Sequence, residues 1–214
     1  MPPAPQRLSP YEAVLGDELS KLHPRLATYF AAIPSASSGI GTGTFDVAGT
    51  PRRWLWPILW VLGKQGVMFP AWEHDLAFTV FNHPVVDARG NPAIVAIRTF
   101  HFSRGDRRMR DAITAEHGGL VDHLGVVRRY VAGLDCAVVD GSLRLASTIL
   151  AIRIGNGHIR IPRFIAPKVT LLESFDDESD SQRVSVTVEL PLVGRLYEYS
   201  GCFSYEIRPG EKYL

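Results

Sequence analysis

Pro92–Gly125 reads PAIVAIRTFHFSRGDRRMRDAITAEHGGLVDHLG. Residues 93–102 are rich in β-branched and aromatic side chains, and residues 103–106 have the composition of a turn. An extended pattern resumes at 107–116, and a second glycine-rich turn leads into 120–124. This order predicts a β-meander, in which three successive strands pair antiparallel.

The same two-residue alternation of apolar and polar side chains recurs nearer the C-terminus, where Val184, Val186 and Val188 alternate with polar residues. The other strand-like runs lie at 76–83, 127–139, 143–154, 168–176, 183–190 and 195–207. No helical pattern separates these runs, so parallel crossovers are not expected. We predict a mainly β (α+β) fold, a curved antiparallel β-sheet or partly open β-barrel.

Two helices are predicted to pack on the sheet. Ser9 and Glu12 form a capping box, and apolar residues at helical spacing follow as far as Pro24. Trp54–Leu62 is apolar all round, so this second helix must be buried or meet an apolar partner. It is either a plug across the sheet or a lid over a cavity. Residues 35–43 are predicted to be a turn into the first strand.

Composition limits the partners. The chain has 214 residues, of which 46% are hydrophobic and 21% charged, and its formal net charge is +1. We predict a flexible lead-in at 1–8 and one barrel-like domain at 9–214. The small net charge argues against a nucleic-acid partner, because bulk electrostatic attraction is missing.

The sequence has no transmembrane segment, since its longest apolar run has nine residues and a membrane span needs roughly 20. The N-terminal residues MPPAPQRLSP lack the apolar stretch of a secretion signal. The predicted location is therefore the cytoplasm.

Several segments occur in a characteristic order across roughly residues 9–207: SPYEAVLGDELSKLHP, RTFHF with a basic hairpin after it, GLVDHLG and GRLYEYSGCF. In these segments the chain resembles an uncharacterised bacterial family, the domain-of-unknown-function family four-one-six-six. The resemblance implies a fold and brings no activity.

No metal or cofactor is predicted, because the histidines and carboxylates lack metal-ligand spacing. General acid–base chemistry is the enzymatic option that remains, with Arg98, His101 and Asp122 as the candidate catalytic residues. Strand parity places Arg98 and His101 on opposite faces of one largely apolar strand. A buried structural ion pair and a catalytic role both account for a charge in that strand.

The predicted function is binding of a hydrophobic small molecule, lipid-, isoprenoid- or polyketide-like, in a cavity between the sheet and the tryptophan-rich helix. Three tryptophans within seven positions favour it, since each can bury about 200 Å². Arg98 and His101 would orient a carboxylate or carbonyl of the ligand. The predicted contact residues are Trp54, Trp60, Phe100, Tyr197 and Tyr199.

Two other functions stay open. The first is a non-redox enzyme (isomerase, cyclase or hydrolase) that uses the same cavity, with His101 or Asp122 carrying the proton. The second is a protein-interaction module without a ligand. The sequence decides neither the ligand's identity nor the oligomeric state.

Overall fold

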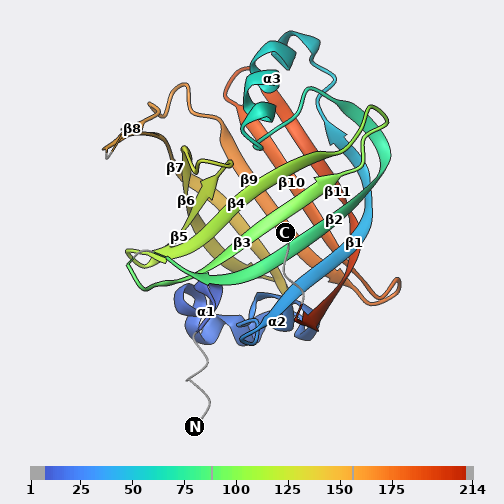
Figure 1. Cartoon of the computed structure of the whole chain (residues 1–214), viewed down its shortest axis with the longest axis vertical. Coiled ribbons are helices and arrows are strands. Elements are labelled where there is room, and N and C mark those ends of the chain that lie inside the picture. The colour runs from blue at the N-terminus through green and yellow to red at the C-terminus, as the bar shows by residue number, and fades with distance from the viewer. Residues whose placement is uncertain (1–7, 88, 156, 211–214) are drawn as a thin grey trace.

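The computed structural model describes residues 8–87, 89–155 and 157–210, so most of the predicted lead-in at 1–8 lies outside the described residues. Ten antiparallel strands form a closed barrel (Figure 1). The predicted mainly β antiparallel fold is confirmed, in its barrel form. The described residues contain eleven strands, of which β8 lies outside the barrel: β1 Ser37–Gly49, β2 Trp72–Val86, β3 Pro92–Phe100, β4 Arg107–Glu116, β5 Gly119–Leu124, β6 Tyr130–Val139, β7 Ser142–Ile154, β8 Gly157–Arg160, β9 Lys168–Asp176, β10 Ser181–Leu190 and β11 Gly194–Pro209.

The barrel closes through β7, which pairs with β6 along its length. On its other side β7 is shared between two strands. Leu143–Ala146 pairs with β9, whereas Ala151–Ile154 pairs with β8, a short strand outside the ring. The contact between β7 and β9 is therefore a short seam, and residues 161–167 cross over beside it.

A helical plug, residues 10–30, lies across one end of the barrel (Figure 1). It consists of α1 Pro10–Leu15, the 3-10 turn η1 Gly16–Lys21 and α2 Pro24–Phe30. The capping box of Ser9 and Glu12 is confirmed. The predicted single helix is interrupted at Gly16, whose φ of 52° lies outside the helical region. Leu15, Leu22, Leu26 and Phe30 are buried against the sheet.

The first strand begins earlier than predicted. Residues 35–36 form the turn, but Ser37–Gly43 already belongs to β1. The glycines there allow close packing of side chains from the neighbouring strands. A Cβ on Gly39 would lie 1.5 Å from Tyr205 Oη, and one on Gly41 would lie 2.5 Å from Val80 Cγ1. The alternating glycines are thus required by packing, which a turn-like composition does not reveal.

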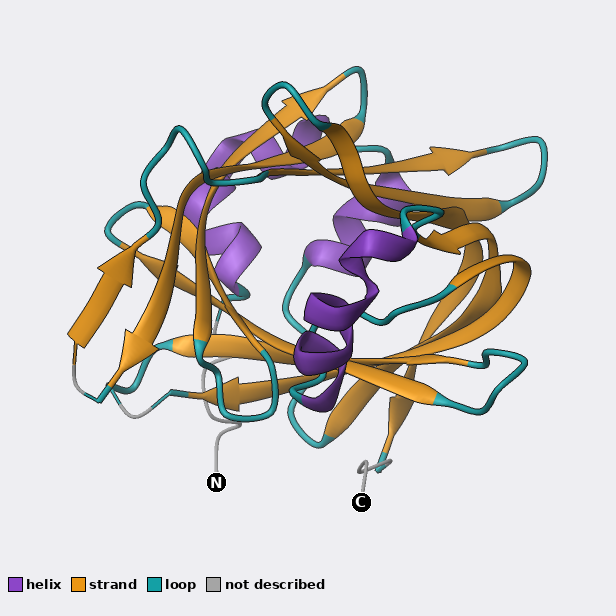
Figure 2. Ribbon diagram, turned by 90° about the horizontal axis from the view of Figure 1, so that it is seen from above, coloured by secondary structure: helices purple, strands orange, loops and turns teal. Residues whose placement is uncertain are grey.

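At the opposite end, η2 Arg53–Leu55 and α3 Trp56–Lys64 lie across part of the barrel (Figure 2). The predicted helix is present, but of the two expectations, burial or contact with an apolar partner, full burial does not hold. Leu59 packs into the core, while Trp54 and Trp60 are 62% and 57% exposed. One face is enough to hold the helix on the barrel. None of the helices in the described ranges is long and apolar enough to cross a membrane.

Candidate functional site

A cavity of about 420 Å³ lies inside the barrel. It extends from the plug, where Tyr11 and Phe30 line it, to α3, where Ile58 and Leu62 line it. Because Ile58 is also 58% exposed, the cavity reaches the surface beside α3. The lining is largely aliphatic and includes Ile94, Ala96, Ile113, Ala132, Leu134, Leu145, Leu171, Val186 and Val188. Such a wall suits an apolar ligand.

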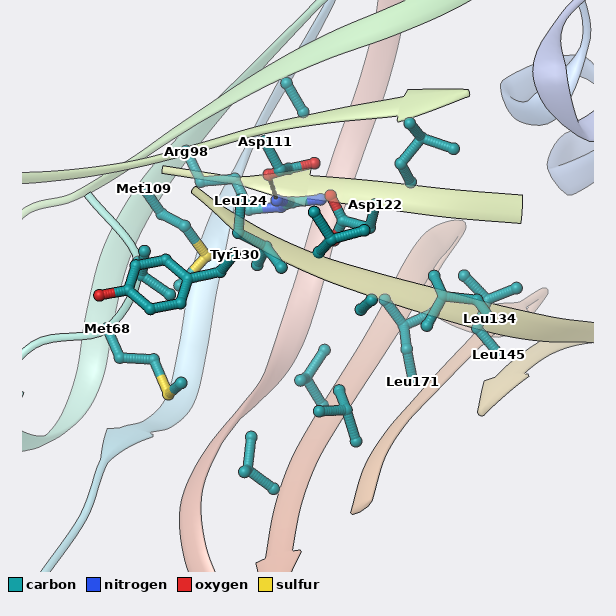
Figure 3. A pocket seen from close by; sticks show the side chains of 18 of the residues that line it. Met68, Arg98, Met109, Asp111, Asp122, Leu124, Tyr130, Leu134, Leu145 and Leu171 are labelled. Carbon is teal, nitrogen blue, oxygen red and sulfur yellow. Dashed lines mark hydrogen bonds and ion pairs between the residues drawn. The ribbon is translucent and has the colours of Figure 1, made fainter. Parts of the chain in front are cut away.

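Three charged residues from adjacent strands meet on one wall of this cavity. Figure 3 shows Arg98 of β3, Asp111 of β4 and Asp122 of β5 turned toward one another. Asp111 lies opposite Ala96, so Arg98 reaches it diagonally and the two form an ion pair. Asp122 is in turn the diagonal neighbour of Asp111, since Asp122 lies opposite Ile113 and Asp111 opposite Leu124. The register of the meander thus assembles the cluster.

Burial shifts the pKa values of the two carboxyl groups in this cluster. It raises the pKa of Asp122 well above the ordinary value, and the neighbouring Asp111 raises it further. Both effects favour the protonated form of Asp122. Burial also raises the pKa of Asp111, but the Arg98 guanidinium opposes this shift and hydrogen-bonds the carboxylate. Asp111 remains the counter-ion of Arg98, so this pair carries no net charge.

Two carboxyl oxygens of the cluster are left without partners. Asp111 Oδ2 and Asp122 Oδ1 are inaccessible to solvent and have no hydrogen-bond partner among the described residues. A buried polar atom without a partner costs about 1–3 kcal/mol. Both residues line the cavity, so their carboxyl groups belong to its wall.

A second polar group lies nearer the plug. Glu173 of β9 is buried, and Gln182 donates a hydrogen bond to it. Burial raises the pKa of Glu173 to about 7, although Arg98 and the bond from Gln182 lower it. Asn82 and Tyr29 line the same region and are joined by a hydrogen bond of 3.5 Å. The cavity therefore has a second polar group besides the Arg98 cluster, and the two interact electrostatically, because Arg98 lowers the pKa of Glu173.

Four of the predicted site residues line the cavity: Arg98, Asp122, Tyr197 and Tyr199. Phe100 is fully buried in the aromatic core beside the cavity, where it packs against Phe45 and Tyr199. It supports the wall without lining the space.

His101 lies outside the cavity, contrary to expectation. β3 ends at Phe100, and the side chain of His101 is 39% exposed and pairs with Asp106 in the following turn. Successive side chains of an extended segment point to opposite faces, so Arg98 points inward and His101, three residues later, points outward. Trp54 and Trp60 also face solvent, because α3 packs through Leu59 on its other side.

Sequence reasoning did not select Asp111, which is the partner of Arg98. The usable signal was parity: Asp111 alternates with Met109 and Ile113, both of which are buried. Within the described ranges, no group of three histidine, cysteine, aspartate or glutamate side chains is arranged to hold a metal ion.

Comparison with known proteins gives two findings. A family model described as "Domain of unknown function (DUF4166)" matches residues 22–203. The chain is also similar to "Uncharacterized protein YndH" of Bacillus subtilis (strain 168), with 26% identity over 196 residues, which cover 87% of this chain and 92% of that protein.

Proposed function

This chain belongs to the family described as domain of unknown function (DUF4166), and from that premise we propose that its barrel binds a hydrophobic small molecule. The observation that carries the proposal is the aliphatic cavity with two unpartnered carboxyl oxygens in its wall. Its volume of about 420 Å³ falls in the range of small-molecule sites, roughly 300–1,000 Å³.

The cluster also favours one chemistry for the ligand's polar end. Arg98 already has Asp111 as its counter-ion, and Asp122 and Glu173 add two more carboxyls to the interior. A ligand carboxylate would bring a second negative charge into this low-dielectric space, at a large cost. A hydroxyl instead adds no charge, and it can both donate to a carboxylate and accept from a protonated carboxyl, so it suits a wall that holds Asp111 and Asp122. We therefore propose a lipid-, isoprenoid- or polyketide-like ligand with a hydroxyl group, in place of the carboxylate or carbonyl expected from the sequence.

Native mass spectrometry of the freshly purified protein, followed by extraction of bound material, tests this proposal directly. A parallel titration compares a long-chain alcohol with the fatty acid of equal length, followed by intrinsic tryptophan fluorescence. We expect the alcohol to bind more tightly by about tenfold or more, which corresponds to one buried hydrogen bond to a charged group. An apo mass together with no response to either compound contradicts the proposal.

Two substitutions on β6 provide a matched pair. Ala132 lines the cavity, whereas Ala137 is at an outward position of the same strand. Ala132→Phe should fill the space and abolish binding, and Ala137→Phe should leave it unchanged. Equal loss in both variants would show that binding does not take place inside the barrel.

The Asp111–Asp122 pair favours a second candidate function, that of a non-redox enzyme. Two adjacent carboxyls of which one keeps its proton are a recurring acid–base arrangement. Asp122 would then be the proton carrier, with Arg98 as the stabilising cation. Asp122→Asn should abolish conversion of the extracted ligand, measured by mass spectrometry of the products, while leaving its binding almost intact. Conversion by the variant at the unchanged rate would exclude this role.

A further inference from the structure

The cavity opens at the α3 end, and the surface there is unlike the rest of the molecule. We define the rim as residues 52–64, 126–129, 153–168 and 191–193, of which residue 156 is not described. Hydrogen bonds join these segments into one surface. The Val126 amide donates to the Gln65 carbonyl next to α3 (2.8 Å), and the Arg153 amide donates to the Arg129 carbonyl (2.7 Å). Arg52 donates to the Val193 carbonyl (3.0 Å).

The rim carries most of the large hydrophobic side chains that the structure exposes. Phe164 is 80% exposed, and Trp54 is 62% exposed. The full set in the rim is Trp54, Ile58, Trp60, Val61, Val126, Val127, Ile154, Ile159, Phe164, Ile165 and Leu192. Exposed apolar side chains gathered around a cavity mouth mark an interaction site, for a membrane or for a protein.

Charge in the rim has one sign. Every charged side chain of these segments is basic: Arg52, Arg53, Lys64, Arg128, Arg129, Arg153, Arg160, Arg163 and Lys168, with His158 in addition. Lys64 Nζ lies 3.5 Å from the centre of the Trp60 ring. The ammonium group and the ring therefore form a cation–π pair on the rim. Acidic side chains border the rim. Asp106 pairs with His101 in the turn at 101–106 at the same end, and Asp87 and Glu116 line a groove together with Arg128, Arg153 and Arg160 of the rim.

Acidic residues gather at the other end of the barrel. The plug carries Glu12, Asp17 and Glu18, and the turn between β9 and β10 carries Asp177, Glu178 and Asp180. The plug also carries Lys21 and Arg25, which pair with Glu18 and Asp180, so acidic residues outnumber basic ones at this end. The net charge of +1 hides this division. The molecule therefore has an axis, with a basic and apolar rim around the cavity mouth and an acidic, closed end opposite.

We infer that the rim docks on an anionic lipid bilayer, with the cavity mouth facing the membrane. Tryptophan and phenylalanine are suited to the headgroup region, and basic side chains bind anionic headgroups. An acidic protein partner would leave the scattered loop hydrophobics uncovered unless it also matched their shape. The inference rests on the proposed function in one respect: it makes the membrane the source or destination of the ligand that the cavity binds. Docking itself does not depend on that function.

Co-sedimentation with phosphatidylcholine vesicles, with and without phosphatidylserine, tests docking. We expect binding only when phosphatidylserine is present, and its loss at high salt, because salt screens the headgroup charges. Arg129→Glu combined with Arg163→Glu should weaken binding by at least about 30-fold, since each basic residue near an anionic surface contributes roughly fivefold.

The matched control reverses two exposed arginines near the closed end, as Arg144→Glu combined with Arg183→Glu. Both lie at the plug ends of their strands, β7 and β10, so binding should stay within about twofold of the unchanged protein. Quenching of tryptophan fluorescence by brominated lipid should report contact with the rim. In Trp54→Phe combined with Trp60→Phe this quenching should fall while sedimentation persists.

Equal binding to vesicles with and without phosphatidylserine, equal loss in both double variants, or no binding at all would overturn the inference. The alcohol titration in the absence of vesicles is run on the same variants. If the cavity takes up ligand and vesicles are not bound, docking alone fails. If vesicles are bound and the cavity takes up nothing, the proposed function fails and the rim remains a docking surface.

Discussion

The two ends of the barrel are each covered by short helical segments, but they treat apolar side chains in opposite ways. In the plug, Leu26 and Phe30 are buried to 0% and 1% exposure, and the outer surface carries charged side chains of both signs. In α3, Leu59 is buried while Trp54 and Trp60 remain exposed. The difference shows that an apolar helix is buried on all sides only where other segments pack against its outer face. At the α3 end no other segment in the described residues packs on that face, which lies beside the opening of the cavity.

The largest expected effect tests whether apolar side chains stabilise the fold in the plug but not at the α3 end. Phe30→Ala should lower the free energy of unfolding by about 4 kcal/mol, the usual cost of emptying a buried phenylalanine site. Trp54→Ala removes a larger ring from the open end and should change it by about 0.5 kcal/mol or less, because that ring is already exposed. Urea unfolding of both variants measures the difference. Similar losses would mean that α3 is held as tightly as the plug.

The next effect concerns the wall between the two ends. Arg98→Leu should cost about 3 kcal/mol, because it leaves Asp111 buried without its counter-ion. Adding Asp111→Leu should recover most of this loss. Arg53→Leu in the rim is the control and should be close to neutral. Chemical denaturation provides the values, and a double variant no more stable than the single one would argue against the pair.

A smaller effect depends on pH. The pKa of Glu173 is raised from 4.5 to about 7, so the folded protein favours its protonated form. This group contributes most to stability below pH 4.5, and the contribution is lost as the pH rises from there to about 7. The full shift corresponds to about 3 kcal/mol as an upper limit, and we expect about 2 kcal/mol. Glu173→Gln should flatten this part of the stability curve. An unchanged slope in the variant would place the pH dependence elsewhere.

The smallest effect concerns how the plug is fastened. Ser9 Oγ donates to the Phe30 carbonyl (2.5 Å) and accepts from the Glu12 amide (3.0 Å), so it ties α1 to α2. Ser9→Ala should cost about 1 kcal/mol, as loss of a helix cap usually does. Ser20→Ala, in the exposed part of the plug, is the matched control. Equal melting temperatures for the two variants would show that the Ser9 cap does not stabilise this end of the barrel.

The strands were predictable from sequence because their side chains alternate, as Val184, Val186 and Val188 do on β10. The charged cluster was only partly predictable. Arg98 and Asp122 stood out as charges in apolar runs, but their meeting with Asp111 depends on the register between three strands, and one sequence does not specify it. The exposure of Trp54 depends on where the barrel wall ends, which composition does not encode.

The seam between β7 and β9 affects how fast a molecule can enter or leave the cavity. The ladder there is limited to Leu143–Ala146 and Thr170–Glu173, and Leu150, Ile161 and Val169 line the cavity beyond it. A short ladder opens at a lower free energy than the long pairings elsewhere in the wall. Because the cavity already opens beside α3, parting of this seam would widen the opening and shorten the residence time of a bound molecule.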